Sequence, residues 1–415
     1  MSLLYNFFIQ LYISGMKLVA LFNPKAKKAI NGRVNWEENL KKKIDKNDSW
    51  IWMHCSSLGE FEQGRPVFEA LKQQFPDHKL ALSFFSPSGY EIRKDYDLAD
   101  VVFYIPFDTP GNAKKLSNIL QPDFWILVKY DYWYNHLKRQ RAIGTKIFVI
   151  SAIFRENQIY FKPYGRWMIN SLKDSLSYFF VQDENSKLLL ENKGVQKVKV
   201  AGDTRYDRVK SIAVSLEKLT WVEEFKAHKK LIVVGSSWEN DEQLWLEFIQ
   251  KHQLNEWKII IVPHEISPVN IQKLMEKLKG KSLKFSDIKP AINLANYDIL
   301  IVDTIGFLSK IYASAELAYV GGGFSTSGVH NTLEPAVFGI PVIIGPNFQK
   351  FEEVKLLIAN DVVYPVNAYK HFEKTLISLT QNQVKRKEIK DKATEVFAKQ
   401  LPSTEIIINY LKTEQ

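Results

Sequence analysis

The residues best suited to chemistry lie in a glycine-rich stretch of the second half of the chain. Residues 321–336 read Gly-Gly-Gly-Phe-Ser-Thr-Ser-Gly-Val-His-Asn-Thr-Leu-Glu-Pro-Ala and follow the apolar run 317–320. Glycines let a backbone approach a ligand closely, and a helix predicted over 333–338 would present free N–H groups to a phosphate. Asn331 and Glu334 would suit the two hydroxyls of a ribose. The stretch therefore predicts a nucleotide-binding loop.

A second candidate is the carboxylate of Glu60, at the end of the sequence Cys-Ser-Ser-Leu-Gly-Glu over 55–60. A carboxylate that follows a strand can act as a general base if its pKa and reach are suitable. The spacing from Ser57 to Glu60 is also that of a helix capping box. Both interpretations stay open, and the two roles do not exclude each other.

Other charged or polar residues also follow predicted strands. Asp131 lies among aromatic residues in 129–135, which suits either a polar, partly apolar substrate or an aromatic core at a domain edge. Arg205 is suited to stabilise a departing phosphate or to pair with a nearby acid. In the second half, Ser236, His264 and the stretch 303–308 follow strands as well. Together these loops predict one site of nucleotide size.

The elements that must position these loops are short apolar runs separated by helical stretches. The runs cover 50–54, 79–85, 101–105, 124–128, 146–150, 178–181 and 198–201, and then 230–235, 257–262, 297–302, 317–320 and 341–344. This alternation is typical of parallel, doubly wound sheets. Such sheets bind ligands at the carboxyl ends of their strands. The sequence therefore predicts an α/β protein with two doubly wound domains facing a cleft.

The length of 415 residues also favours two domains. We predict an N-terminal helix over 1–22, a first domain over 23–205, a charged linker over 206–228 and a second domain over 229–415, whose last helix could return to the first. The single cysteine, Cys55, excludes a disulfide framework and fits a reducing compartment.

The net charge is +10, and residues 1–46 supply 9 − 3 = +6 of it. The basic residues follow the apolar start of the chain, whereas a secretory signal has its charges first. Polar residues interrupt the apolar run, so an interfacial helix is favoured over a membrane-spanning or a plain packed helix. A nucleic-acid binder would carry its charge along one face with stacking aromatics, so we expect an anionic lipid surface as the partner and no nucleic acid.

Taken in order, these motifs resemble those of the Kdo transferases. These glycosyltransferases move 3-deoxy-D-manno-octulosonic acid (Kdo) from CMP-Kdo onto a lipid A precursor. The motifs are Ser56-x-x-Gly59-Glu60, Asp303-Thr304-x-Gly306, and the glycine run that ends in His330-Asn331-Thr332-Leu333-Glu334-Pro335-Ala336. The resemblance covers nearly the whole chain. It implies the GT-B architecture, in which two Rossmann-like domains face a cleft, with an N-terminal membrane-associating helix.

The resemblance implies that Glu60 is the catalytic base and that Asp131 and Arg205 assist the transition state. The residues implied to contact CMP-Kdo are Ser236, Pro263, His264, Gly306, Phe307, Leu308, Gly322, Gly323, Asn331, Thr332, Leu333 and Glu334. The chain departs from the family's usual Pro-Arg-His at 263–265, Gly-Glu-Leu at 306–308, lysine at 205 and Glu-x-Glu-Leu-Trp-Pro-Asn at 129–135. These departures concern the phosphate and acceptor contacts.

The reaction implied is an inverting transfer of Kdo from CMP-Kdo to a lipid A precursor (lipid IVA) in lipopolysaccharide biosynthesis, at the cytoplasmic face of the inner membrane. CMP-Kdo is a substrate, and the scheme needs no cofactor or metal. The sequence has no His, Cys and Asp cluster with metal-ligand spacing. The alternative is another sugar-nucleotide-dependent GT-B glycosyltransferase. A dehydrogenase would need G-x-G-x-x-G after a strand, which the glycines at 321–323 do not match.

Overall fold

The computed structural model describes residues 2–215, 217–253, 255–278 and 282–414. The chain forms two compact units, the first made of residues 1–208 and 401–415 and the second of residues 209–400. The boundary at 208/209 lies within helix α10 (Thr204–Ser215), inside the stretch predicted as a linker. The prediction of two parallel, doubly wound sheets is confirmed, because each unit contains one seven-stranded sheet.

The first sheet has the strand order β3-β2-β1-β4-β5-β6-β7, and all of its neighbouring strands run parallel. Its strands are β1 (Trp50–Cys55), β2 (Lys79–Phe84), β3 (Val101–Tyr104), β4 (Phe124–Val128), β5 (Lys146–Ala152), β6 (Tyr178–Val181) and β7 (Val198–Val200). Its helices are α1 (Ser2–Val19), α2 (Pro24–Asn31), α3 (Trp36–Lys41), α4 (Leu58–Gln74), α5 (Pro87–Arg93), α6 (Pro110–Ile119), α7 (Tyr134–Ala142), α8 (Arg166–Ser175), α9 (Glu184–Glu191) and α19 (Ser403–Lys412), with the 3-10 turns Ile159–Phe161 and Pro163–Gly165.

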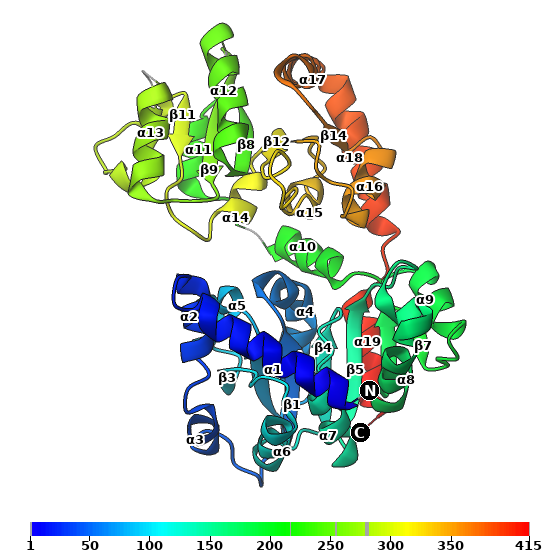
Figure 1. Ribbon diagram of the computed structural model, residues 1–415. Coiled ribbons are helices and arrows are strands. Elements are labelled where there is room, and N and C mark those ends of the chain that lie inside the picture. The colour runs from blue at the N-terminus through cyan, green and yellow to red at the C-terminus, as the bar shows by residue number, and fades with distance from the viewer. Residues whose placement is uncertain (1, 216, 254, 279–281, 415) are drawn as a thin grey trace. The chain divides into compact units, whose positions relative to one another are not determined.

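Helices cover both faces of this sheet (Figure 1). Side chains alternate between the faces of a strand, so Trp52 points to one face and Met53 to the other. Trp52 stacks on Trp125 of the neighbouring strand, with ring centroids 4.1 Å apart, in a core that α6, α7 and α8 close. Met53 belongs to the opposite core, which α4 and α19 close. Ile407 of α19 is fully buried there, so the last helix of the chain completes the first unit.

The second sheet has the strand order β10-β11-β9-β8-β12-β13-β14, again all parallel. Its strands are β8 (Lys230–Ser237), β9 (Trp257–Pro263), β10 (Ser282–Lys284), β11 (Ile299–Ile301), β12 (Leu317–Val320), β13 (Val342–Ile344) and β14 (Val363–Pro365). Its helices are α11 (Thr220–Lys226), α12 (Glu239–Lys251), α13 (Pro268–Leu278), α14 (Leu308–Tyr312), α15 (Leu333–Ala336), α16 (Glu352–Ala359), α17 (Tyr369–Gln381) and α18 (Gln383–Ala398), with the 3-10 turns Phe285–Asp287 and Leu294–Asn296.

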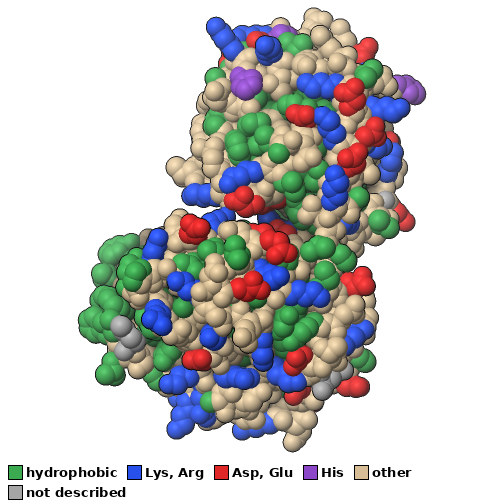
Figure 2. Space-filling model, turned by 90° about the vertical axis from the view of Figure 1, so that its right-hand side faces the viewer, with side chains coloured by type: hydrophobic (Ala, Val, Ile, Leu, Met, Phe, Trp, Pro, Cys, Tyr) green, Lys and Arg blue, Asp and Glu red, His purple; other side chains and the backbone are tan. Residues whose placement is uncertain are grey.

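Helix α1 lies on the first unit and has no buried residue. Tyr5 donates a hydrogen bond to Asp108 at 2.7 Å, and the ring of Tyr12 packs near Phe85 and Phe107. Large apolar side chains of its other side are exposed, namely Leu3, Leu4, Phe7, Phe8, Leu11 and Leu18. Hydrophobic side chains gather at one edge of this unit in Figure 2. Among the helices of the described residues, none has the length and apolar character needed to cross a membrane.

Candidate functional site

The candidate residues follow strands at the centre of each sheet. In the first sheet β1 and β4 are neighbours although β2 and β3 separate them in sequence. In the second sheet β8 and β12 are related in the same way. At such a position, called a topological switch point, the connections that follow the two strands leave toward opposite faces of the sheet. Doubly wound sheets bind their ligands there. Glu60 and Asp131 follow β1 and β4, whereas Ser236 and the glycine loop belong to β8 and β12.

Glu60 is the third residue of α4 and is only 9% exposed. Its carboxylate accepts a hydrogen bond from the backbone N–H of Ser56. Ser57 occupies the N-cap position, but its side chain makes no capping hydrogen bond. Glu60 thus reaches back over the helix start, and the serine half of the predicted capping box is not formed.

Burial raises the pKa of Glu60 to about 7, and the charge of Asp131 is the next cause. The hydrogen bond from Ser56 and the charge of Lys129 act in the opposite direction. A carboxyl group that titrates near pH 7 can accept a proton and give it up again under physiological conditions. The electrostatics of this position therefore suit a general base.

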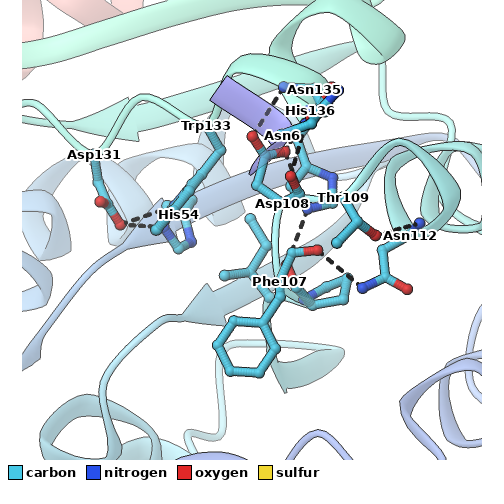
Figure 3. Close-up of polar contacts among 12 residues, drawn as sticks. Asn6, His54, Phe107, Asp108, Thr109, Asn112, Asp131, Trp133, Asn135 and His136 are labelled. Carbon is cyan, nitrogen blue, oxygen red and sulfur yellow. Dashed lines mark hydrogen bonds and ion pairs between the residues drawn. The ribbon is translucent and has the colours of Figure 1, made fainter. Parts of the chain in front are cut away.

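Asp131 is held by two donors that both reach Oδ2 (Figure 3). His54 Nε2 lies 2.8 Å from this oxygen, and Trp133 Nε1 donates to it at 3.1 Å. The Asp131 side chain is 20% exposed, whereas the His54 side chain is fully buried. The carboxylate is therefore fixed from the protein side and remains accessible from outside.

The loop that carries Asp131 leads into α7, whose first turn is fixed by the buried carboxylate of Asp108. Asp108 accepts hydrogen bonds from the backbone N–H groups of Asn135 at 2.9 Å and His136 at 2.8 Å (Figure 3). The side-chain amide of Asn135 also donates to Asn6 of α1 at 2.8 Å. The N-terminal helix and the loop of Asp131 are thus attached to the same scaffold.

Arg205 forms the ion pair that was one of its two predicted roles. Its guanidinium donates to Asp203, with the shortest contact at 2.6 Å. Asp203 also accepts a hydrogen bond from Gln63 at 2.7 Å. Burial acts to raise the pKa of Asp203, but the charge and hydrogen bonds of Arg205 outweigh it and leave the pKa lowered. The pair is therefore a stable structural unit at the start of α10.

In the second unit the glycine loop is packed against other protein backbone. A Cβ atom on Gly322, whose φ is +90°, would lie 2.6 Å from the Gly328 carbonyl oxygen, and one on Gly323 would lie 2.6 Å from the Gly345 nitrogen. The N–H of Gly322 donates to the buried carboxylate of Asp241 at 2.9 Å. These glycines are thus required for the loop to fold on itself.

Three rings lie beside this loop. Trp238 Nε1 donates to His330 Nε2 at 3.0 Å, and their planes differ by only 8°. His264 stacks against both, with ring centroids 4.5 Å from Trp238 and 4.4 Å from His330. Because His330 Nε2 accepts this bond, its proton is on Nδ1. Burial and the neighbouring His264 lower the pKa of His330 to about 4, so His330 is uncharged at neutral pH.

Asn331 and Glu334 lie together, as their spacing predicted. The Asn331 amide donates to Glu334 at 3.0 Å, and its oxygen accepts from the Leu333 N–H at 3.1 Å. Thr332 and Leu333 are buried, and Thr332 Oγ1 has no hydrogen-bond partner among the described residues. The helix predicted over 333–338 is shorter than expected, because α15 covers only Leu333–Ala336 before the turn at 337–339.

The remaining candidates are divided between open and packed positions. Gly306 has a φ of +97° and open space around it. Phe307 packs with Trp221 and Phe285, at centroid distances of 5.9 and 5.2 Å. Pro263 ends β9, and the backbone N–H of His264 donates to Ser237 at 2.8 Å. Ser236 adopts a φ of +52° at an irregularity of β8.

Sequence reasoning did not identify the residues that hold these candidates in place. The sequence marks His54 only as part of a strand and assigns no role to Asp241. Asp241 accepts hydrogen bonds from the Trp238 N–H at 3.0 Å and the Tyr319 hydroxyl at 2.6 Å. Its signal was an acidic residue in the first turn of a helix that follows a strand. His54 carried a comparable signal, a polar residue in an otherwise apolar strand.

Comparison with known proteins gives matches over most of the chain. A family model described as 3-deoxy-D-manno-octulosonic-acid transferase (kdotransferase) matches residues 31–208. The 3-deoxy-D-manno-octulosonic acid transferase of Haemophilus influenzae is 25% identical over 376 residues, which are 87% of this chain and 86% of that protein. A bifunctional glycosyltransferase/methyltransferase of Fusobacterium nucleatum is 23% identical over 385 residues, 89% of this chain. The match spans only 59% of that longer relative.

Among solved structures, UDP-GlcNAc 2-epimerase from Neisseria meningitidis has a similar fold, with a TM-score of 0.61. The match covers 88% of this chain and 100% of that one at 14% sequence identity. At this identity the likeness concerns the fold alone.

Proposed function

We propose that this chain, which is similar to the 3-deoxy-D-manno-octulosonic acid (Kdo) transferases, is a glycosyltransferase of that family, with the GT-B architecture, and transfers Kdo from CMP-Kdo to a lipid A precursor. The observation that carries the proposal is the pair Glu60 and Asp131 at the switch point of the first sheet, with the pKa of Glu60 raised to about 7. The acceptor is a phosphorylated lipid such as lipid IVA, and the transfer inverts the configuration at the anomeric carbon.

In this reaction Glu60 removes the proton of the acceptor hydroxyl. The hydroxyl oxygen forms a bond to the anomeric carbon of Kdo, on the face opposite the nucleotide. The bond between that carbon and the phosphate oxygen breaks, and CMP leaves with the electron pair. Glu60 keeps the proton until it exchanges with water. The proposal needs no metal or cofactor.

Asp131 contributes negative charge beside the reacting groups. Positive charge develops on the sugar ring when a glycosidic bond breaks, and a fixed carboxylate stabilises such charge. Arg205 is proposed to support the departing phosphate, although its ion pair with Asp203 at 2.6 Å restricts how far its guanidinium can turn. Of the two, Asp131 has the arrangement better suited to a direct role.

The second unit is proposed to bind CMP-Kdo. Asn331 and Glu334 would accept and donate hydrogen bonds with the ribose hydroxyls, and the loops of Ser236, Pro263–His264, Gly306–Leu308 and Gly322–Gly323 would contact the remainder. The support for this proposal is that Ser236 and Pro263 lie at the carboxyl ends of β8 and β9, and that the other loops follow β11 and β12 of the same sheet. The uncharged ring of His330 adds a neutral N–H donor beside them.

Helix α1 is proposed to attach the protein to the cytoplasmic face of the inner membrane. Its exposed side carries Leu3, Phe7 and Leu11, which are 84%, 63% and 59% exposed. The basic residues that follow would face anionic lipid. Replacing Phe7 and Phe8 with Ser should reduce sedimentation with vesicles that contain anionic phospholipid. Unchanged sedimentation would argue against this placement.

The transfer itself is tested by incubating the purified protein with CMP-Kdo and a tetraacylated lipid A precursor. The lipid product, read by mass spectrometry, should gain the mass of one or more Kdo units. CMP-Kdo should be replaced by other sugar nucleotides in parallel reactions. Transfer from one of those and not from CMP-Kdo would favour the alternative, a different sugar-nucleotide-dependent glycosyltransferase. No transfer from any donor would contradict the proposal.

A further inference from the structure

Three hydrogen-bonded side chains behind Asp131, those of Trp52, His54 and Ser83, are buried, and packing alone does not explain them. Trp52 and His54 alternate with apolar residues on β1 and lie on the same face of the sheet. Ser83 of β2 is the register partner of His54. Trp52, His54 and Ser83 are all fully buried. A polar side chain in such a position costs free energy unless it is hydrogen-bonded.

The donors and acceptors of these side chains can be assigned one by one. An indole nitrogen can only donate, so Trp52 Nε1 donates to Ser83 Oγ, at 2.7 Å. The serine hydroxyl then gives its single proton to His54 Nδ1, at 2.8 Å. His54 Nε2 therefore carries the ring proton and donates it to Asp131 Oδ2, at 2.8 Å. Every donor in this arrangement has an acceptor.

The other protonation states leave a group unmatched. If Nδ1 carried the only ring proton, the lone pair of Nε2 would face the carboxylate oxygen of Asp131 at 2.8 Å. If both nitrogens were protonated, Ser83 would receive two N–H groups. Its own hydroxyl proton would then have no acceptor among the described residues. A buried donor without an acceptor is costly.

We propose that His54 is a positioning residue, which Trp52 and Ser83 hold as the neutral Nε2–H tautomer so that it orients Asp131 toward Glu60. A neutral donor fixes the carboxylate without cancelling its charge, whereas a lysine or arginine at this place would neutralise it. Both bonds to Asp131, from His54 and from Trp133, end on Oδ2. Oδ1 is thereby left for the reacting groups.

The consequence for the reaction is electrostatic. The charge of Asp131 raises the pKa of Glu60. If His54 no longer holds Asp131, the carboxylate can turn outward into water, and its effect on Glu60 weakens. The proposal rests on the proposed function only in taking Glu60 as the base.

Three variants test this role. His54→Phe removes the donor, and we expect kcat to fall by about 10²-fold, the effect typical of a misplaced catalytic group. The acid limb of the pH profile, where the rate falls as the pH decreases, should move to lower pH. His54→Gln can still donate to Asp131 and accept from Ser83, so it should restore most of the activity. Ser83→Ala keeps the His54 ring but removes the hydroxyl that donates to Nδ1, so the ring is no longer held in one tautomer. This variant should move the acid limb in the same direction as His54→Phe, but by less.

The matched control is His136→Phe, which removes another fully buried histidine of the first unit. The ring of His136 donates to the Pro106 carbonyl at 3.0 Å and lies 3.7 Å from the Asp108 carboxylate, and among the described residues it has no hydrogen bond to Asp131. This variant should leave the acid limb in place, whatever it does to stability. If His54→Phe lowers kcat only in proportion to the loss of folded protein, with an unmoved acid limb, the proposal is wrong.

A measurement without substrate separates this inference from the proposed function. The ¹⁵N chemical shifts of the His54 ring distinguish a protonated from a bare nitrogen. We expect a bare Nδ1 and a protonated Nε2 at neutral pH in the whole protein, and loss of this pattern in Ser83→Ala. The opposite tautomer or a doubly protonated ring would overturn the proposal. Wild-type protein with the expected tautomer but no transfer would instead contradict the proposed function.

Discussion

The charge of Asp131 raises the pKa of the Glu60 carboxyl group, and only burial raises it more. Glu60 lies in the first turn of α4, directly after β1, and Asp131 lies in the loop after β4; these two strands are neighbours in the first sheet. A second carboxylate beside a buried one favours its protonated form. The neighbourhood thus turns an ordinary glutamate into a group that exchanges its proton near neutral pH.

Glu60→Gln should abolish transfer and leave nucleotide binding intact. The amide cannot accept the proton of the acceptor hydroxyl, and loss of a general base lowers kcat by about 10²- to 10⁴-fold. Steady-state kinetics and calorimetric titration with CMP measure the two effects. Glu62→Gln is the matched control, because Glu62 lies in the same helix and pairs with Arg93 at 2.7 Å. Turnover retained in Glu60→Gln would remove this residue from the mechanism.

The rate should depend on pH through the state of Glu60. A base must be deprotonated to act, so kcat/KM should fall as pH decreases below about 7, the raised pKa of Glu60. Asp131→Asn removes the second cause of that shift, and its acid limb should lie at lower pH than in the wild type. Rates measured from pH 5 to 9 decide the matter. An acid limb that Asp131→Asn leaves in place would show that another group controls it.

Gly306 and Gly322, from two loops of the proposed nucleotide site, offer a paired test of how tightly these loops are packed. Gly306 and Gly322 both have positive φ, at +97° and +90°, but only Gly322 has protein atoms where a Cβ would lie. Gly306→Ala should cost about 1–2 kcal/mol of unfolding free energy from backbone strain alone. Gly322→Ala should cost more and should also weaken CMP binding, because it pushes on Gly328 and His330. Urea unfolding measures the loss of stability, and titration with CMP measures the loss of affinity. Equal losses of unfolding free energy in the two variants would contradict the packing described.

Much of the fold follows from local sequence, because its central strands are continuous apolar runs such as 124–128 and 257–262. The strands β10 and β14 were not predicted. Each has only three residues and lies at an edge of the second sheet, where pairing with a single neighbour defines the strand. The strand β10, Ser-Leu-Lys, has no apolar run of its own to reveal it, whereas β14 lies in the short apolar run 362–366, which a proline interrupts.

The candidate site was predictable to the extent that it lies in loops after strands. Its supporting contacts depend on which strands are neighbours. His54 and Ser83 are in register only because β1 pairs with β2, and Asp241 reaches Gly322 only because β8 lies beside β12. The capping-box spacing at Ser57 and Glu60 was ambiguous for a different reason, since one carboxylate can serve both the helix start and a substrate.

The ribose contact can be tested with the nucleotide itself. If Asn331 and Glu334 bind the ribose hydroxyls, the wild type should bind CMP more tightly than 2′-deoxy-CMP. Glu334→Ala should lose about 10- to 100-fold in CMP affinity, as expected for a lost hydrogen bond to a charged group. The same variant should bind the two nucleotides nearly equally. A variant that still prefers CMP as strongly as the wild type would place the ribose elsewhere.

The position of α19 has a consequence for how the protein is made. Ile407 and Leu411 are buried in the core between the first sheet and α4, although the whole second unit precedes them in sequence. The ribosome therefore releases every strand of the first sheet long before α19, the helix that covers part of one face of that sheet. Until residues 403–412 emerge, side chains such as Phe148 and Phe180 lack part of their cover. The half of the protein that is synthesised first is thus the half that matures last.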